Sequence, residues 1–394
     1  MIHHIIKFIW NRKRSLVWVF VEQTLVFGVL LFCFIFSVER ISRQFSKGNI
    51  NVNNISSITF TSIYKTYHLE NESDEDRTKF KNLFEQIKGW QSVELVSINR
   101  MGSVPGIQNQ TNDSVSFNNN QYSADIKFCD ENFYKMFSPK LTEGEWFRDN
   151  YESDIPPALI TQRLSNRIKL TGSAIGQSIS YLGITYRIIG VVEAFKDRAD
   201  EDPVAAIFLP VSTSTGSNRG WEYVVKYKSG KENEFSKTFF VEFYRNFPRD
   251  QYMPWLIDLK KLIGQVDFLN FSMLLYIFAI PTAFLLIFAF LGTFGVVWMQ
   301  SKKRMNELGL RMALGCTSAL LQRTIIFENL ILTTFSMLPG LIVVANLYAF
   351  APKGWEWIAA VGAAVVIMWL FAAFSAWYPA RKAAKVMPVE ALRN

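Results

Sequence analysis

The chain has 394 residues, a hydrophobic fraction of 49% and a formal net charge of +8. Its apolar residues are concentrated in a few long runs, which excludes a purely soluble globular protein. The basic residues lie beside these runs, so the positive charge indicates membrane topology and gives no reason to expect nucleic-acid binding.

Four stretches reach the roughly 18–20 apolar residues that mark a membrane-spanning helix. We expect spans at 16–38, 271–299, 324–350 and 355–378. The first run is longer than the apolar part of a secretory signal peptide, and no small-residue cleavage site follows it, so it is expected to remain as a helix. The prediction is an α-helical membrane domain of four transmembrane helices, with a large domain inserted at 39–270.

The distribution of charge predicts the orientation of these spans. Segments 1–15, 300–323 and 379–394 together hold thirteen Lys and Arg residues against two Glu, whereas 39–270 holds 28 basic and 29 acidic residues. Lys and Arg accumulate in the cytoplasmic segments of membrane proteins. Both termini and the 300–323 loop are therefore predicted to be cytoplasmic, with the large domain outside.

The outer segment reads as an α/β domain with a helical stalk before the second span. Apolar residues alternate around Ile58, recur at helical spacing from Phe80, and alternate again over Val93–Ile98. The Asn- and Ser-rich stretch 106–121 is expected to be a mobile surface loop. Gly183 separates two alternating apolar runs, which favours a hairpin turn.

The outer segment offers no evident reactive site. Its single cysteine, Cys129, cannot form an internal disulfide, and His68 has no partner at a metal-ligand or catalytic spacing. The segment 172–178 has glycines but carries Gln177 where a phosphate-binding loop needs Lys. We therefore expect no metal, no cofactor and no catalytic residue in this chain.

The loop between the second and third spans contains the segment ELGLRMALG. It consists of Glu307, Leu308, Gly309, Leu310, Arg311, Met312, Ala313, Leu314 and Gly315. Glu307 and Arg311 stand four residues apart, the spacing at which side chains pair on one face of a helix. Leu308, Met312 and Leu314 are expected to form an apolar ridge, and Gly315 to end the helix in a left-handed conformation. An alternative is a helix lying in the lipid headgroups.

The last residues carry a second spaced motif directly after the fourth span. Its members are Pro379, Arg381, Pro388, Glu390 and Arg393, and Pro379 is expected to break the span at the membrane surface. A basic cytoplasmic tail would account for the arginines and lysines but not for Pro388 or Glu390. Two carboxylates, Glu22 and Glu328, lie within apolar runs and are expected to face protein or the interface.

These motifs resemble those of the MacB/FtsX-type ABC-transporter permease family. ELGLRMALG is similar to the family pattern E-I-G-[IL]-R-x-A-[LV]-G, with Cys316 replacing a usual Ala, and the terminal motif is similar to P-A-R-x-A-x-x-x-x-P-x-E-A-L-R. In the outer segment Gly144 and Phe147 stand at matching places, with Glu145 in place of Arg. The resemblance implies an outer domain of two lobes and a polar dimer contact for Glu328.

The family also implies a function. The chain would be a non-catalytic permease subunit of the bacterial inner membrane, pairing with a second copy or a related permease, and docking at 307–315 a separate ABC ATPase that binds the ATP. Export of peptides, toxins or antibiotics with a periplasmic adaptor and an outer-membrane channel is the leading expectation. Regulation of a cell-wall hydrolase and release of lipoproteins are alternatives within the family. A membrane-anchored sensor is an alternative of another class, but no cytoplasmic output domain is expected after Arg393.

Overall fold

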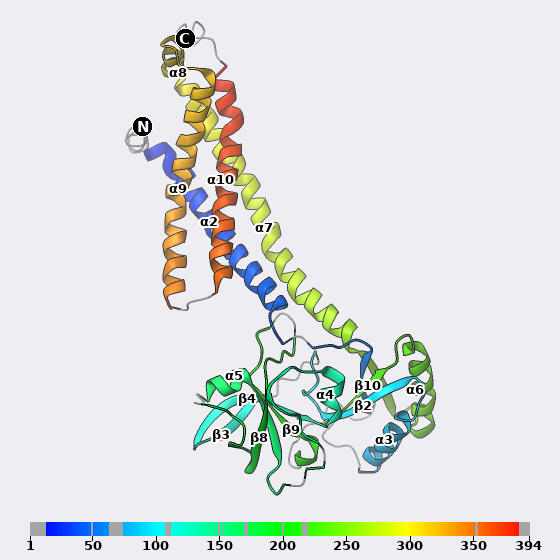
Figure 1. Ribbon diagram of the computed structural model, residues 1–394. Helices are drawn as coiled ribbons and strands as arrows, with labels where there is room; N and C mark the ends of the chain where they lie inside the picture. Colours follow the sequence, from blue (N-terminus) through cyan, green and yellow to red (C-terminus); the bar gives the residue numbers. More distant parts are fainter. Residues whose placement is uncertain are drawn as a thin grey trace. The chain divides into compact units, whose positions relative to one another are not determined.

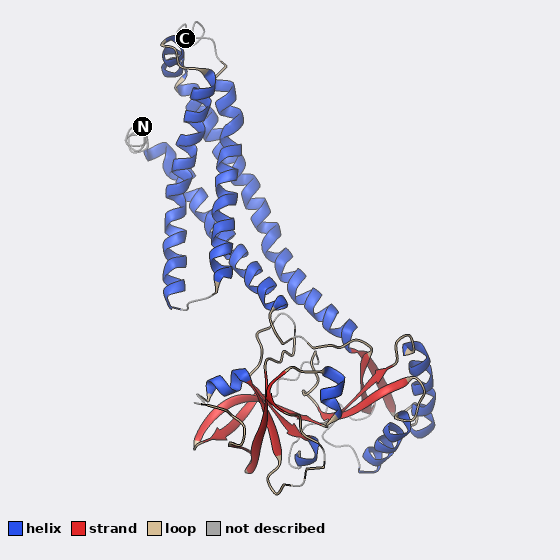
Figure 2. Cartoon of the chain, in the orientation of Figure 1, coloured by secondary structure: helices blue, strands red, loops and turns tan. Residues whose placement is uncertain are grey.

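The structure is a computed structural model that describes residues 13–48, 50–62, 74–106, 112–148, 150–151, 153–168, 172–198, 201–214, 220–350 and 354–385. The chain divides into two compact units (Figures 1 and 2). The membrane unit contains 1–42 and 271–394, and the outer unit contains 43–270. Pro388, Glu390 and Arg393 of the terminal motif lie outside the described residues.

Four long helices form most of the membrane unit. They are α2 (Lys13–Phe45), α7 (Leu259–Lys303), α9 (Ser318–Phe350) and α10 (Trp355–Ala383). Each contains a segment long and apolar enough to cross a membrane, namely Val17–Arg43, Ser272–Lys303, Ser318–Ala349 and Trp355–Ala383. The four predicted transmembrane helices are therefore confirmed as helices of spanning length. The short helix α8 (Met305–Ala313) follows α7.

Small residues let α10 pack closely inside the membrane unit. Ala360, Ala364, Ala372, Ala376 and Ala380 recur at multiples of four, and each is fully buried. Spacing of this kind brings helix backbones together where no hydrophobic effect drives association. Asn329 of α9 adds a hydrogen bond by donating Nδ2 to the carbonyl of Ala372 at 2.7 Å.

The prediction that Pro379 breaks the last span is wrong, because α10 continues through this residue to Ala383. A proline inside a helix removes one backbone hydrogen bond. Here the loss falls one turn from the helix end, where few further bonds depend on it. Pro379 is buried in the membrane unit, so packing holds the last turn in place.

The first lobe of the outer unit is a four-stranded antiparallel sheet with two helices. Its first half is β1 (Ile55–Ser62), α3 (Asp74–Ile87) and β2 (Val93–Arg100). Its second half is β10 (Trp221–Tyr227), α6 (Glu232–Asn246) and β11 (Tyr252–Asp258). The strand order β11-β1-β10-β2 with two βαβ halves is the ferredoxin-like arrangement. An aromatic-rich core joins helices and sheet, including Phe80, Phe84, Tyr223, Phe235, Phe239 and Phe243.

The second lobe is inserted between β2 and β10 (Figure 1). Its seven-stranded sheet has the order β5-β8-β6-β9-β4-β3-β7. The strands are β3 (Asn112–Phe117), β4 (Asn120–Cys129), β5 (Leu141–Gly144), β6 (Pro157–Thr161), β7 (Ser178–Tyr181), β8 (Ile184–Val192) and β9 (Ala206–Pro210). Two short helices, α4 (Asn132–Phe137) and α5 (Gln162–Arg167), and the 3-10 turn η2 (Val211–Thr213) complete it. The two ends of the insertion meet where Met101 N donates to Gly220 O at 2.9 Å.

The expectation of a loop over 106–121 is wrong over most of its length. Residues 107–111 lie outside the described residues, but β3 and the start of β4 form a hairpin around Asn118 and Asn119, whose φ values are 48° and 63°. Asparagine tolerates this left-handed backbone, so the pair makes a tight turn without glycine. The buried side chains of Val115 and Phe117 give the hairpin its core face.

The predicted hairpin at Gly183 is confirmed. Leu182 and Gly183 form a two-residue loop with φ values of 49° and 81° between β7 and β8, which pair antiparallel. Gly144 is a second position where only glycine fits, at the pairing of β5 with β8. There Gly144 has a φ of 76°, and a Cβ added to it would lie 2.0 Å from the carbonyl oxygen of Ile189.

Two ionisable side chains are buried in the outer unit, Glu222 in the first lobe and Lys127 in the second. Lys127 is 1% exposed; its Nζ donates to Gly102 O at 2.8 Å and lies 2.7 Å from Asp197 Oδ1. Glu222 is fully buried and accepts a hydrogen bond from Ser57 Oγ at 3.3 Å. Burial raises the pKa of Glu222 to about 8, against the opposing effects of the Ser57 hydrogen bond and the Lys127 charge. The carboxyl group is therefore mostly neutral at pH 7.

Candidate functional site

The segment predicted to dock a partner folds as the short amphipathic helix α8. Its end has the geometry expected of Gly315, which has a φ of 96°. Gly315 N donates to Met312 O and Cys316 N donates to Arg311 O, each at 3.0 Å. This pair of bonds is the Schellman motif, which satisfies carbonyls at a helix C-terminus.

The predicted apolar ridge is wrong in its membership. Leu308 is only 3% exposed and packs in a cluster with Leu321 and Ile325 of α9. Leu310 and Leu314 are 53% and 80% exposed, and they stand four residues apart on one face. Leu308 therefore attaches α8 to the membrane unit, while Leu310 and Leu314 form the apolar surface that the helix offers.

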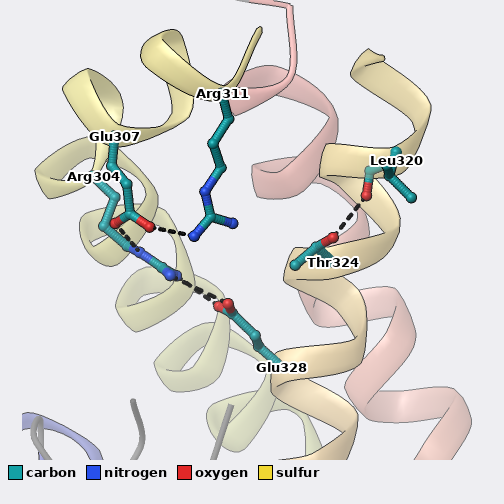
Figure 3. A network of polar contacts seen from close by, with 6 residues as sticks. All are labelled: Arg304, Glu307, Arg311, Leu320, Thr324 and Glu328. Carbon is teal, nitrogen blue, oxygen red and sulfur yellow. Dashed lines mark hydrogen bonds and ion pairs between the residues drawn. The ribbon is translucent and has the colours of Figure 1, made fainter. Parts of the chain in front are cut away.

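A chain of four alternating charges runs from α9 to the end of α8 (Figure 3). Arg304 Nη1 and Nη2 contact both carboxylate oxygens of Glu328, at 2.6 and 3.2 Å. Arg304 Nε lies 3.4 Å from Glu307 Oε2, and Arg311 Nη2 donates to Glu307 Oε1 at 2.6 Å. The two arginines and two glutamates balance in charge, so the chain is neutral as a whole.

The members of this chain differ in burial. Side-chain exposure is 6% for Arg304 and 17% for Glu328, against 41% for Glu307 and 40% for Arg311. A bidentate guanidinium–carboxylate pair compensates the cost of placing both charges near hydrocarbon. The inner pair therefore fixes the start of α8 to α9, and the outer pair adds support on the surface.

The predicted site residues are thus brought together in part. Glu307 and Arg311 pair as their spacing predicted, and Glu328 joins them through Arg304. Glu328 thus has a partner within the chain, and the dimer contact expected for it stays a prediction. Sequence reasoning missed Arg304 as a site residue, although a lone Glu in an apolar run signals that a basic partner is needed.

A small cavity with both apolar and polar side chains in its wall adjoins the inner pair. It measures about 40 Å³ and lies between α2, α7 and α9. Thr293 Oγ1 and Gln300 Nε2 in its wall are buried and have no hydrogen-bond partner among the described residues. A cavity needs at least about 10–15 Å³ to hold one water molecule. The volume is therefore sufficient for a water that would pair with Thr293 and Gln300 beside Arg304 and Glu328.

The other predicted membrane carboxylate, Glu22, lies apart from this chain. Its carboxylate packs against Gly292 of α7, where an added Cβ would be 2.7 Å from Glu22 Oε1. From its position in the sequence Glu22 could reach Arg12, Arg14 or water, and Arg12 and the side chain of Arg14 lie outside the described residues. No group of three His, Cys, Asp or Glu side chains that could hold a metal occurs in the described part of the chain.

Two models of known protein families match this chain. A family model described as the MacB-like periplasmic core domain matches residues 24–235, more than half of the chain. The chain belongs to this family. A second model, described as the FtsX-like permease C-terminal domain, matches 278–388 and so contains the whole charge chain of α8 and α9. The recognition from motifs is confirmed.

Named relatives and solved structures are distant. The macrolide export ATP-binding/permease protein MacB of Vibrio parahaemolyticus is 22% identical over 304 residues, covering 71% of this chain and 44% of that protein. A probable syringafactin export ATP-binding/permease protein of Pseudomonas syringae gives the same three percentages over 294 residues. The chain thus spans less than half of the length of these relatives. The periplasmic region of MacB from Actinobacillus actinomycetemcomitans aligns with 55% of this chain and 94% of that one, at 13% identity and a TM-score of 0.38.

Proposed function

We propose that this chain is the permease subunit of an ABC transporter, in which a separate ATPase docks on α8 and drives movement of the outer unit. The observation that carries the proposal is the charge chain from Glu328 to Arg311. It fixes to the membrane unit a short helix whose outer face is apolar. ATP binds to the partner in this proposal, and this chain carries no cofactor or catalytic residue.

Because α8 is attached to α9, it can transmit the movement of a bound partner to the membrane unit. A partner bound to Leu310 and Leu314 would exert force on a helix whose first residues are fixed to α9 by the buried Arg304–Glu328 ion pair. An anchored helix moves with its neighbours, whereas a helix resting in lipid headgroups would slide. The continuous helix α7, from Leu259 to Lys303, connects the two units along the chain. Pro281 removes one backbone hydrogen bond within α7, and the internal hydrogen bonds on either side of it resist bending.

The proposed topology places α8 and both termini in the cytoplasm and the outer unit in the periplasm of a bacterial inner membrane. The concentration of Lys and Arg in 1–15, 300–323 and 379–394 supports it. Two permease subunits, identical or related, would pair in the membrane and each dock an ATPase.

Export of peptides, toxins or antibiotics is the proposed transport activity. The names of two relatives, which refer to macrolide export and syringafactin export, support this class. An export system of this kind would engage a periplasmic adaptor and an outer-membrane channel. Regulation of a cell-wall hydrolase and lipoprotein release are the other activities that the test below separates.

The test is purification of the tagged full chain from native membranes in mild detergent with a non-hydrolysable ATP analogue, followed by mass spectrometry. We expect an ABC ATPase to co-purify with the unaltered chain and to be lost from the double variant Leu310→Ser, Leu314→Ser. Leu320→Ser is the matched control, because Leu320 is also 53% exposed but belongs to α9.

The accompanying proteins decide among the activities. An adaptor and an outer-membrane channel support export, whereas a cell-wall hydrolase or a lipoprotein carrier would replace export with the corresponding activity. If no ATPase accompanies the unaltered chain, the permease assignment fails. If an ATPase accompanies the double variant as well as the unaltered chain, docking on α8 fails while the assignment stands.

A further inference from the structure

An aromatic and basic cluster lies where α7 and α10 end, and it contains none of the four residues of the charge chain. Trp298 of α7 stacks on Tyr378 of α10, with ring centroids 6.1 Å apart and planes 9° from parallel. Lys302 Nζ is 5.7 Å and Lys382 Nζ is 4.6 Å from the centre of the Trp298 ring. One indole ring therefore receives an ammonium group from each of the two helices.

These ammonium groups are not balanced by acidic side chains. Within the described residues, neither Lys302 nor Lys382 forms an ion pair with a carboxylate. The nearby Arg304 and Arg311, by contrast, are both paired with glutamates. Two like charges on one ring repel each other, so an anion placed between them would be stabilised by both.

A cavity lies beside the two lysines. It measures about 90 Å³, and its lining includes Trp298, Ser301, Lys302, Met305, Pro379 and Lys382. The wall consists largely of apolar and aromatic surface, and the charges are carried by exposed side chains. The site thus pairs a cationic entrance with an apolar interior.

The position in the spans identifies the kind of anion. Trp298 and Lys302 lie in the last turns of the segment Ser272–Lys303, and Lys382 lies in the last turn of Trp355–Ala383. Trp and Tyr rings favour the membrane–water boundary, and basic pockets between spans bind the headgroups of anionic lipids. An ammonium group suits phosphate as a compact point charge.

We propose that this site binds an anionic phospholipid, with its phosphate between Lys302 and Lys382 and part of an acyl chain along the apolar wall. Lipid is favoured over free phosphate because the entrance lies at the membrane boundary and the wall would leave an inorganic anion only partly satisfied. The site lies outside the charge chain of α8, so the inference does not depend on the docking proposal.

The test is native mass spectrometry of the full chain, released from detergent micelles containing equimolar phosphatidylglycerol and phosphatidylcholine with identical acyl chains. We expect the unaltered chain to retain phosphatidylglycerol preferentially. Each lysine that contacts the phosphate is expected to contribute about fivefold to binding, so Lys302→Gln with Lys382→Gln should reduce the preference by about thirtyfold. Lys303→Gln with Lys385→Gln removes the same charge from neighbouring exposed positions and should keep most of the preference.

Three results would overturn the proposal. Equal retention of the two lipids by the unaltered chain would show no anionic site. Equal losses in the two double variants would reduce the effect to general surface charge. Displacement of the bound phosphatidylglycerol by millimolar inorganic phosphate would identify a free-anion site in place of a lipid site.

Discussion

The guanidinium of Arg304 holds both carboxylate oxygens of Glu328, although the two residues belong to different segments and are separated in sequence by the whole of α8. Each compensates a charge that would be costly to leave alone near hydrocarbon. The pair also sets where α8 begins relative to α9. Its consequences can be measured independently of any partner.

Loss of Arg304 should therefore cost far more than loss of Arg311. Arg304→Gln leaves the largely buried Glu328 without its bidentate partner, for an expected loss of roughly 3–5 kcal/mol in the free energy of unfolding. Arg311→Gln removes a half-exposed i,i+4 pair worth about 0.3–0.5 kcal/mol. Denaturant unfolding of the full chain in detergent measures both. Similar losses for the two variants would contradict the assigned difference in burial.

Substitutions of Leu308 and Leu310 in α8 should have different effects, the first on stability and the second on docking of the ATPase. Leu308→Ala opens a cavity in a buried cluster and should lower the free energy of unfolding by about 2–5 kcal/mol. Leu310→Ala, at a position 53% exposed, should change stability by less than about 0.5 kcal/mol but weaken association with the ATPase. Unfolding and co-purification of each variant provide the two readouts. An undiminished association of the Leu310 variant would count against the proposed outer face.

Two glycines with similar backbone angles should respond differently to alanine. At Gly144 a new Cβ would meet the Ile189 carbonyl oxygen at 2.0 Å, so β5 must move away from β8. Gly183 has nothing within 4 Å of that position and carries only the cost of a left-handed conformation, about 1–2 kcal/mol. Thermal unfolding should show the Gly144→Ala variant as clearly the less stable. The reverse order would mean that β5 is not held as described.

The buried Glu222 should make stability depend on pH. Its pKa rises from about 4.5 in the unfolded chain to about 8 in the folded one. The folded state therefore binds more protons in this range, and stability falls as pH rises from about 5 to about 8, by at most about 1.4 kcal/mol per pH unit. Above the folded pKa this contribution no longer changes.

Glu222→Gln provides the control for that prediction, because a neutral amide of nearly the same shape replaces the carboxyl group. Thermal unfolding of the full chain at pH 5, 6, 7 and 8 should show a smaller decline for this variant than for the unaltered chain. Parallel declines in the two proteins would assign the pH dependence to other groups.

Local patterns predicted local structure well. The i,i+4 spacing of Glu307 and Arg311 was sufficient to predict their pairing, and Gly315 was sufficient to predict the end of α8. The four spans follow from hydropathy because a helix in lipid must satisfy its own backbone. The hairpin at Gly183 follows from a glycine between two alternating runs.

Features that depend on packing between distant segments were not predictable in the same way. The periodicity of α8 does not say which leucine faces α9, so Leu308 was wrongly placed on the docking surface. The partner of Glu328 lies on another segment, and only the energetic need for one was visible. The hairpin at Asn118 was missed because Asn-rich composition suggests a loop unless the φ values of the pair are known.

The hydrogen bond from Met101 to Gly220 has a consequence for how the outer unit can be altered. It brings together the two points at which the second lobe leaves and re-enters the ferredoxin-like lobe, the same points that a tight hairpin would join. The second lobe is thus a cassette, meaning a domain inserted at a single junction. If it were removed, the end of β2 and the start of β10 would already be adjacent. Recognition surfaces could be exchanged by grafting a different cassette at this junction, with the host sheet keeping its strand order.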